Sequence, residues 1–115
     1  MNCSVGIDLV EVPRVGRLAR RKRFLERVFS PAEVAYCRGK KNAAQHFAVR
    51  FAAKEAVYKA LGLKGVSHRQ ISVRNLPSGQ PVACLGGRLK RLEKRLSLSL
   101  SHTAHYATAV AVFQK

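Results

Sequence analysis

A long run in the middle of the chain, from Asn42 to Leu61, carries apolar side chains at steps of three and four residues. This spacing is typical of a helix that buries one face, and Gly62 follows the run as a C-terminal stop. The apolar face consists of Ala44, Phe47, Ala48, Phe51 and Ala52. Glu55 takes the next position on that face, so the spacing predicts that one carboxylate points inward.

Alternating sequences near both ends of the chain predict strands. Residues 3–9 place Val5 and Ile7 on one face and Asp8 on the other. Toward the C-terminus "LSLSLSH" alternates strictly, and "HYATAVAVF" continues as a more apolar strand after a tight connection at residues 101–105. Before them, "QISVRNL" and "VACL" flank the turn "PSGQP" and predict a hairpin.

Shorter helices complete the predicted order of elements. Ser30, Pro31 and Glu33 form the pattern of a capping box, which predicts a helix that begins here and ends near Gly39. Further helices are predicted at residues 13–21, 23–28 and 86–96. This order predicts a single α+β domain over residues 1–115, in which helices pack on one side of an antiparallel sheet.

The charge balance predicts anionic partners. The chain has 22 Lys and Arg against 6 Asp and Glu, a formal net charge of +16. Such a chain suits nucleic acid, acidic lipid, a polyphosphate ligand or an acidic protein. The cations alternate with apolar residues at 14–27 and 88–95, which favours basic faces on folded elements over a disordered arm. Nucleic-acid binding stays an alternative, although no zinc finger and no base-stacking aromatic pair is visible.

The cysteines, the apolar runs and the N-terminal segment together indicate in which cellular compartment the protein is expected. The three cysteines are odd in number and widely spaced, which favours free thiols in a reducing environment. No apolar run approaches the roughly 18 residues of a membrane span. The N-terminal segment lacks the basic region and cleavage site of a signal peptide, so a cytoplasmic protein without a membrane partner is expected.

Two carboxylates in apolar surroundings are the main candidates for chemistry. Asp8 is the only aspartate of the chain and follows alternating apolar residues, and Glu55 lies on the apolar helix face. Magnesium is often held by one or two carboxylates together with substrate phosphates. The alternative is that Glu55 pairs with Lys54 or Lys59 and that Asp8 caps the helix after it.

Two histidines offer a weaker signal. His102 and His105 are three residues apart at the end of an alternating strand. A zinc site is one reading, but no third Cys or His ligand lies at a suitable spacing. A structural role or a contact with phosphate is the alternative.

Three segments together resemble the signature blocks of a known family. "GIDLVEVPRV" at 6–15, "RFAAKEAVYKALG" at 50–62 and "LSLSHT" at 98–103 are similar, in order and spacing, to those of the holo-[acyl-carrier-protein] synthases. This resemblance to the small 4′-phosphopantetheinyl transferases implies transfer of phosphopantetheine from coenzyme A to a serine of an apo acyl carrier protein. It also implies Mg²⁺, release of adenosine 3′,5′-bisphosphate, and a homotrimer with active sites between protomers.

The resemblance also implies roles for individual residues. It makes Asp8 and Glu55 the metal ligands. A base must also accept the serine proton, and our candidate is Glu55, acting directly or through a metal-bound water. The resemblance places Lys59 at the pyrophosphate and His102 at the phosphates of the coenzyme. The predicted further contacts with the coenzyme are Arg50, Lys54 and Gly62. The basic segment that begins at Arg14 and includes Arg21 is expected to meet the acidic carrier protein, because opposite charges speed and orient encounter.

Overall fold

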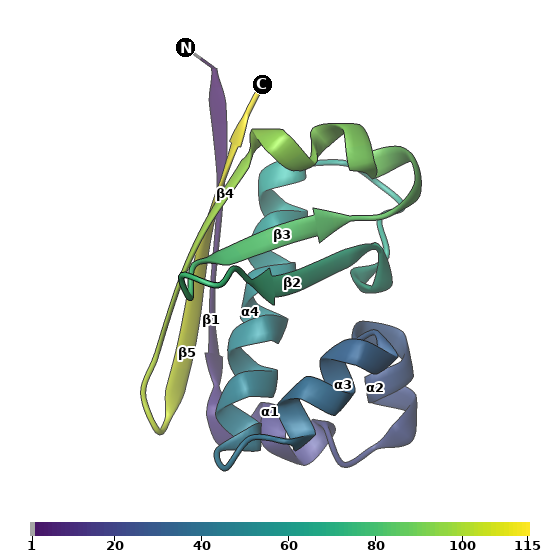
Figure 1. Ribbon diagram of the computed structural model, residues 1–115. Helices are drawn as coiled ribbons and strands as arrows, with labels where there is room; N and C mark the ends of the chain where they lie inside the picture. Colours follow the sequence, from purple (N-terminus) through teal and green to yellow (C-terminus); the bar gives the residue numbers. More distant parts are fainter. Residues whose placement is uncertain (1) are drawn as a thin grey trace.

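The computed structural model describes residues 2–115 and has the α+β fold that the sequence predicts. Its main sheet is antiparallel, with the strand order β1 (Cys3–Glu11), β5 (Tyr106–Gln114), β4 (Leu96–His102). The first and last strands pair along their whole length, with Asp8 opposite Ala109. The two ends of the chain therefore lie side by side (Figure 1).

Helix α4 (Ala43–Leu61) packs along one face of this sheet (Figure 1). The approach is closest at Gly6, where a Cβ atom would lie 1.9 Å from the backbone oxygen of Ala56. Only glycine allows strand and helix to come this near. The helix ends as predicted: Gly62 is left-handed, with φ of 64°, and donates its N–H to the Tyr58 carbonyl.

A second layer covers the other side of α4 (Figure 1). Its helical part is α1 (Val12–Leu18), α2 (Lys22–Val28) and α3 (Pro31–Arg38). Its other part is the hairpin of β2 (Ile71–Asn75) and β3 (Pro81–Leu85), flanked by the 3₁₀ turns η1 (His68–Gln70) and η2 (Gly87–Arg95). The hairpin is a sheet of its own, and the predicted helix at 86–96 is the 3₁₀ segment η2.

This second layer changes which side chains of α4 are buried. Arg50 and Lys54 lie on the flanks of the apolar face, yet they are 4% and 0% exposed because the second layer covers them. The side chain of Glu55 is 27% exposed and lies at an edge between the layers. The helical period predicted the side of α4 on which Glu55 lies, but it did not encode how deeply these three side chains are buried.

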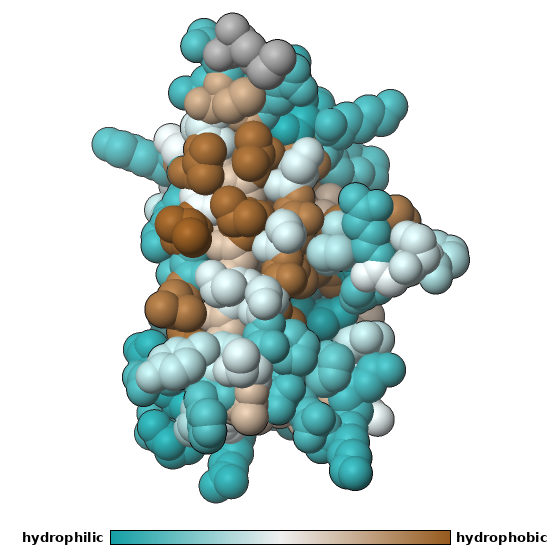
Figure 2. Space-filling model, turned by 90° about the vertical axis from the view of Figure 1, so that its left-hand side faces the viewer, coloured by the Kyte–Doolittle hydropathy of each residue, from teal (hydrophilic) through white to brown (hydrophobic). Residues whose placement is uncertain are grey.

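The outer face of the main sheet is left uncovered. Three apolar residues of β1 point outward with more than half of their surface exposed: Val5 61%, Ile7 63% and Leu9 65%. Their cross-strand partners on β5 are Val112, Val110 and Thr108. Figure 2 shows an apolar area on this side of the molecule.

Two other sequence predictions can be compared with the structure. All three cysteines are free thiols, as expected, and burial raises the pKa of Cys37 to about 11. Within residues 2–115, no helix is both long and apolar enough to cross a membrane.

Candidate active site

Asp8 and Lys59 meet where β1 crosses α4. The Lys59 ammonium donates to Asp8 Oδ1 at 3.2 Å and to the Ile7 carbonyl at 3.0 Å. The Asp8 side chain is 17% exposed and that of Lys59 is 50% exposed, so the pair lies open to solvent on one side. Asp8 does not cap the next helix, since the N-cap of α1 is Glu11 without a side-chain hydrogen bond.

Glu55 lies one helical turn before Lys59 on α4, but its partner comes from elsewhere. His68 Nε2 lies 2.9 Å from Glu55 Oε1, and the two side chains are 29% and 27% exposed. A carboxylate only accepts hydrogen bonds, so Nε2 carries the hydrogen in this contact. The expectation that a lysine pairs with Glu55 is therefore wrong: Lys59 binds Asp8, and Lys54 binds Glu33.

The two carboxylates suit a hard divalent cation. Asp8 uses Oδ1 for Lys59 and Glu55 uses Oε1 for His68, and within residues 2–115 their second oxygens have no hydrogen-bond partner. Carboxylate oxygens are the ligands that Mg²⁺ prefers, and it commonly takes only one or two from the protein. Across those same residues no three His, Cys, Asp or Glu side chains cluster, and the fit to Mg²⁺ rests on the chemistry of the two carboxylates alone.

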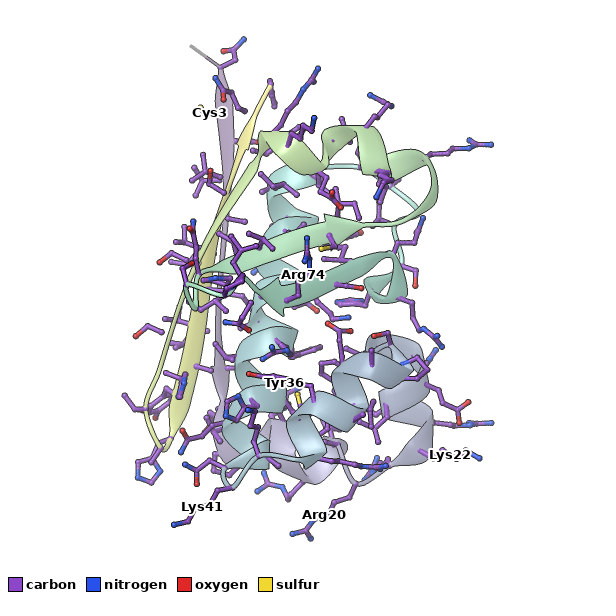
Figure 3. The ribbon with its side chains drawn as sticks, viewed as in Figure 1. Cys3, Arg20, Lys22, Tyr36, Lys41 and Arg74 are labelled. Carbon is purple, nitrogen blue, oxygen red and sulfur yellow. The ribbon has the colours of Figure 1, made fainter. Side chains whose placement is uncertain are left out.

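A second group of side chains lies around the first half of α4 and is cationic. The Arg50 guanidinium stacks on the Tyr36 ring at 4.3 Å and donates to Asn75 Oδ1 at 3.0 Å. Its Nε atom is buried and, among the described residues, has no partner. Arg50 also lines a cavity of about 450 Å³, and Figure 3 shows Tyr36 in the space between the helices and the β2–β3 hairpin. We call this group, which also contains Lys40, His46 and His102, the ring–cation cluster.

Histidines extend the ring–cation cluster to the end of β4. The rings of Tyr36 and His46 are 5.9 Å apart, and those of His46 and His102 are 6.3 Å apart. Burial, and then the cations Arg50, His102 and Lys40, lower the pKa of His46 below its usual value. Neighbouring positive charges that disfavour protonation of His46 would attract an anion such as phosphate.

Lys54 does not take part in either group. Its ammonium is fully buried, lies 2.6 Å from Glu33 Oε1, and donates to the carbonyls of Val28 and His68. Burial lowers its pKa, and the Glu33 carboxylate acts in the opposite direction. With these contacts the ammonium is not presented to a ligand, so the structure does not bring Lys54 to the candidate site.

The basic residues Arg14 and Arg21 lie on the exposed surface near α1 and α2. Arg21 lines a groove of about 570 Å³ together with Arg23, Arg27 and the apolar side chains of Leu18, Phe24 and Val28. The groove reaches Ser67 and His68, and so it approaches the partner of Glu55. Arg14 does not line this groove, and Figure 3 shows the nearby Arg20 and Lys22 pointing into solvent.

Two contacts of α4 were not predicted from the sequence: that of His68 with Glu55 at the site, and that of Glu33 with Lys54 away from it. His68 lies in a Gly-rich connection, where no periodicity assigns a direction to a side chain. Glu33 was explained by its capping box, which the structure confirms, and its second role toward Lys54 left no separate pattern. No sequence signal pointed to this second role, because the burial of Lys54 is seen only in the structure.

Comparisons with known proteins match nearly the whole chain. The family model of the 4′-phosphopantetheinyl transferase superfamily matches residues 4–111. A holo-[acyl-carrier-protein] synthase of Koribacter versatilis is 40% identical over 124 residues, covering 99% of each chain. The crystal structure of the Neisseria meningitidis synthase superposes with a TM-score of 0.86 at 34% identity, covering 97% of this chain and 98% of that one. The Helicobacter pylori synthase in complex with coenzyme A gives 0.82 at 34% identity, covering 96% and 99%.

Proposed function

Since the chain belongs to the holo-[acyl-carrier-protein] synthase family of the 4′-phosphopantetheinyl transferase superfamily, we propose that it transfers 4′-phosphopantetheine from coenzyme A to a serine of an apo acyl carrier protein. The reaction depends on Mg²⁺ and releases adenosine 3′,5′-bisphosphate. The observation that carries this proposal is the meeting of Asp8 with Lys59 on the helix that also bears Glu55.

Asp8 and Glu55 are the proposed ligands of the cation. Each has one oxygen oriented by a neighbouring side chain and one oxygen available. When bound there, Mg²⁺ would offset the charge that develops on the diphosphate as its P–O bond breaks. Lys59 places its ammonium beside Asp8, where it can hold a diphosphate oxygen.

The transfer forms one bond and breaks one. The serine oxygen bonds to the phosphorus that bears the pantetheine arm, and the P–O bond to adenosine 3′,5′-bisphosphate breaks. The serine proton needs an acceptor, for which Glu55 is the candidate inferred from the sequence. Phosphoryl transfer asks a protein mainly for positioning and charge stabilisation, which these side chains can supply.

The ring–cation cluster is the proposed contact for the phosphates on the adenosine side of the coenzyme. It contains Arg50, which lines the neighbouring cavity, and the exposed His102 beside His46. Gly62, with its left-handed backbone, has open space above its Cα atom and leaves room for a ligand to approach the end of α4.

The groove along α1 and α2 is the proposed docking surface for the carrier protein. Arg21, Arg23 and Arg27 surround apolar side chains there, which suits an acidic helix with an apolar side. Arg14 is proposed to add charge beside it. The end of the groove at His68 directs the carrier's serine toward the Glu55 region.

A homotrimer with active sites between protomers is also proposed. Contiguous exposed apolar residues mark protein interfaces, and on the outer sheet face Val5, Ile7 and Leu9 are each more than 60% exposed. The ring–cation cluster lies at the first half of α4, which carries His46 and Arg50, and the Asp8–Glu55 region lies at the second half, which carries Glu55 and Lys59. A coenzyme that contacts both can do so across two protomers.

Mass spectrometry of an acyl carrier protein tests the transfer. Incubation of the apo carrier with coenzyme A, Mg²⁺ and this protein should add one phosphopantetheine group to the serine. A chelator should stop the reaction, and added Mg²⁺ should restore it. A carrier mass that stays unchanged in the presence of Mg²⁺ would contradict the proposed function.

Light scattering tests the trimer separately. The wild-type protein should have the mass of three chains, and Ile7→Lys should lower it by placing a charge in the apolar face. A wild-type protein with the mass of one chain would contradict this part of the proposal.

A further inference from the structure

His68 forms a hydrogen bond with the proposed metal ligand Glu55, but the proposed reaction gives His68 no role. We propose that His68 is a positioning residue: it holds Oε1 of Glu55 so that the second oxygen is available to the metal ion. The inference rests on the proposed function, in which Glu55 is a ligand of that ion. The Nε2–Oε1 distance of 2.9 Å is that of a direct hydrogen bond.

The imidazole is fixed in orientation by two aromatic rings of α4. Phe51 and Tyr58 lie one turn before and one turn after Glu55, on the same side of the helix. The His68 ring is nearly parallel to both, with interplanar angles of 16° and 17° and centroid distances of 6.0 and 6.3 Å. Because the imidazole packs nearly parallel to two other rings, its rotation is restricted and Nε2 points toward Glu55.

The backbone of His68 is fixed as well. Its carbonyl accepts a hydrogen bond from the buried ammonium of Lys54 at 3.2 Å. Ser67 precedes it as the N-cap of η1, in a capping box with Gln70. Arg69 follows it and donates to the Glu26 carbonyl of α2 at 3.0 Å. The segment is thus tied to α4 at His68 itself and to α2 at Arg69.

Such an arrangement has a known consequence at metal sites. A carboxylate ligand that is held by a hydrogen bond loses less conformational freedom when the ion binds. Removal of a partner of this kind typically lowers metal affinity by about 10- to 100-fold. His68 also lines the groove proposed for the carrier protein, so the same residue contacts both this docking surface and the proposed metal ligand Glu55.

Mn²⁺ binding tests the inference without the reaction. His68→Phe keeps an aromatic ring between Phe51 and Tyr58 but removes the hydrogen-bond donor, and His68→Gln keeps a donor. Titration with Mn²⁺ in the presence of coenzyme A, followed by electron paramagnetic resonance of the free ion, gives the affinities. We expect about 10-fold or weaker binding in His68→Phe, partial recovery in His68→Gln, and wild-type affinity in the matched control His105→Phe, whose side chain is exposed.

A double-variant cycle shows whether His68 acts through Glu55. In a Glu55→Gln background, His68→Phe should cause no further loss of Mn²⁺ affinity. In transfer assays His68→Phe should raise the Mg²⁺ concentration for half-maximal rate more than it lowers kcat at saturating Mg²⁺. Thermal unfolding verifies that each variant is folded.

Two results would overturn the inference while leaving the proposed function intact. One is unchanged Mn²⁺ affinity in folded, active His68→Phe. The other is tighter binding in that variant, which would mean that the imidazole competes with the ion for Glu55. Failure of the wild-type protein to bind Mn²⁺ or to transfer phosphopantetheine would instead contradict the proposed function itself.

Discussion

Helix α4 carries two lysines, five residues apart, that each pair with a carboxylate, and the two pairs differ in their surroundings. Lys54 and Glu33 have side chains that are 0% and 6% exposed, and further hydrogen bonds surround them. Lys59 and Asp8 are 50% and 17% exposed, and Asp8 keeps an oxygen without a partner among residues 2–115. The same type of ion pair therefore serves the fold at one position and remains available to a ligand at the other.

The difference follows from the layers around α4. Lys54 faces the second layer, where α3 and β2 meet, and Glu33 accepts hydrogen bonds there from Ser30 and Val73 as well. A buried charge without its partner costs several kcal/mol, whereas an exposed pair contributes about 0–1 kcal/mol. The two pairs should thus respond to substitution in opposite ways.

The largest expected effect is the loss of transfer on substitution of Asp8. Asp8→Asn removes the charge that holds the cation, which contributes several kcal/mol at the transition state. We expect kcat/KM to fall by about a thousandfold, with a melting temperature close to that of the wild type. Steady-state assays of carrier modification and thermal unfolding measure the two quantities. A fully active Asp8→Asn protein would remove Asp8 from the proposed site.

Substitution of Glu33 should have the reverse pattern. Glu33→Gln leaves the buried Lys54 ammonium without its counter-charge, and we expect unfolding in urea to show a loss of about 3 kcal/mol. The folded fraction should keep most of its transfer activity. A double replacement, Glu33→Met with Lys54→Met, removes both charges and serves as the control: it should be less destabilised than Glu33→Gln if the unpaired charge is the cause. Equal stability of wild type and Glu33→Gln would contradict a structural role for the pair.

A smaller effect is expected from salt, which should weaken interactions of the exposed charges much more than those of the buried pair. Exposed charges are screened over about 10 Å at 0.1 M salt, so the KM for the carrier protein should rise with ionic strength. Arg21→Ala should raise that KM by about threefold to fivefold at low salt and reduce its salt dependence. Titration of rates with NaCl measures both effects, and parallel salt curves for wild type and Arg21→Ala would exclude Arg21 from the docking surface.

The smallest expected effect concerns the protonation of His46. Its pKa in the folded state is below the unfolded value, so the unfolded chain binds more protons just below pH 6.5. Stability should therefore rise with pH through that window and fall on acidification, and His46→Phe should weaken this dependence. Addition of adenosine 3′,5′-bisphosphate should raise the pKa, because an anion favours the protonated ring. Nuclear magnetic resonance titration of the imidazole checks both shifts, and a pKa that is insensitive to the nucleotide would place the phosphates elsewhere.

The contrast also shows how far the sequence could predict this molecule. Alternation predicted the strands that carry Asp8 and His102, and helical spacing predicted α4 with its stop at Gly62. Both signals are local, since they depend only on which face of one element a residue occupies. They place Glu55 and Lys59 on one side of a helix, and the family resemblance added their proposed roles.

What remained unpredicted depends on contacts between distant segments. The burial of Arg50 and Lys54 is set by the number of layers around α4, which periodicity does not encode. His68 reaches Glu55 because the connection after α4 folds back over the helix, and a Gly-rich stretch gives no sign of that path. The outer sheet face with Val5, Ile7 and Leu9 likewise became recognisable only when the structure showed α4 on the other face.

The central claim is that Asp8 and Glu55 together hold one divalent cation at the diphosphate of coenzyme A. Crystals grown with coenzyme A and Mn²⁺ test it most directly, because the anomalous signal of manganese locates the ion independently of the protein atoms. The account predicts a single strong peak bonded to one oxygen of each carboxylate, with Lys59 beside the same diphosphate. Bound coenzyme with its manganese peak away from both carboxylates would contradict it.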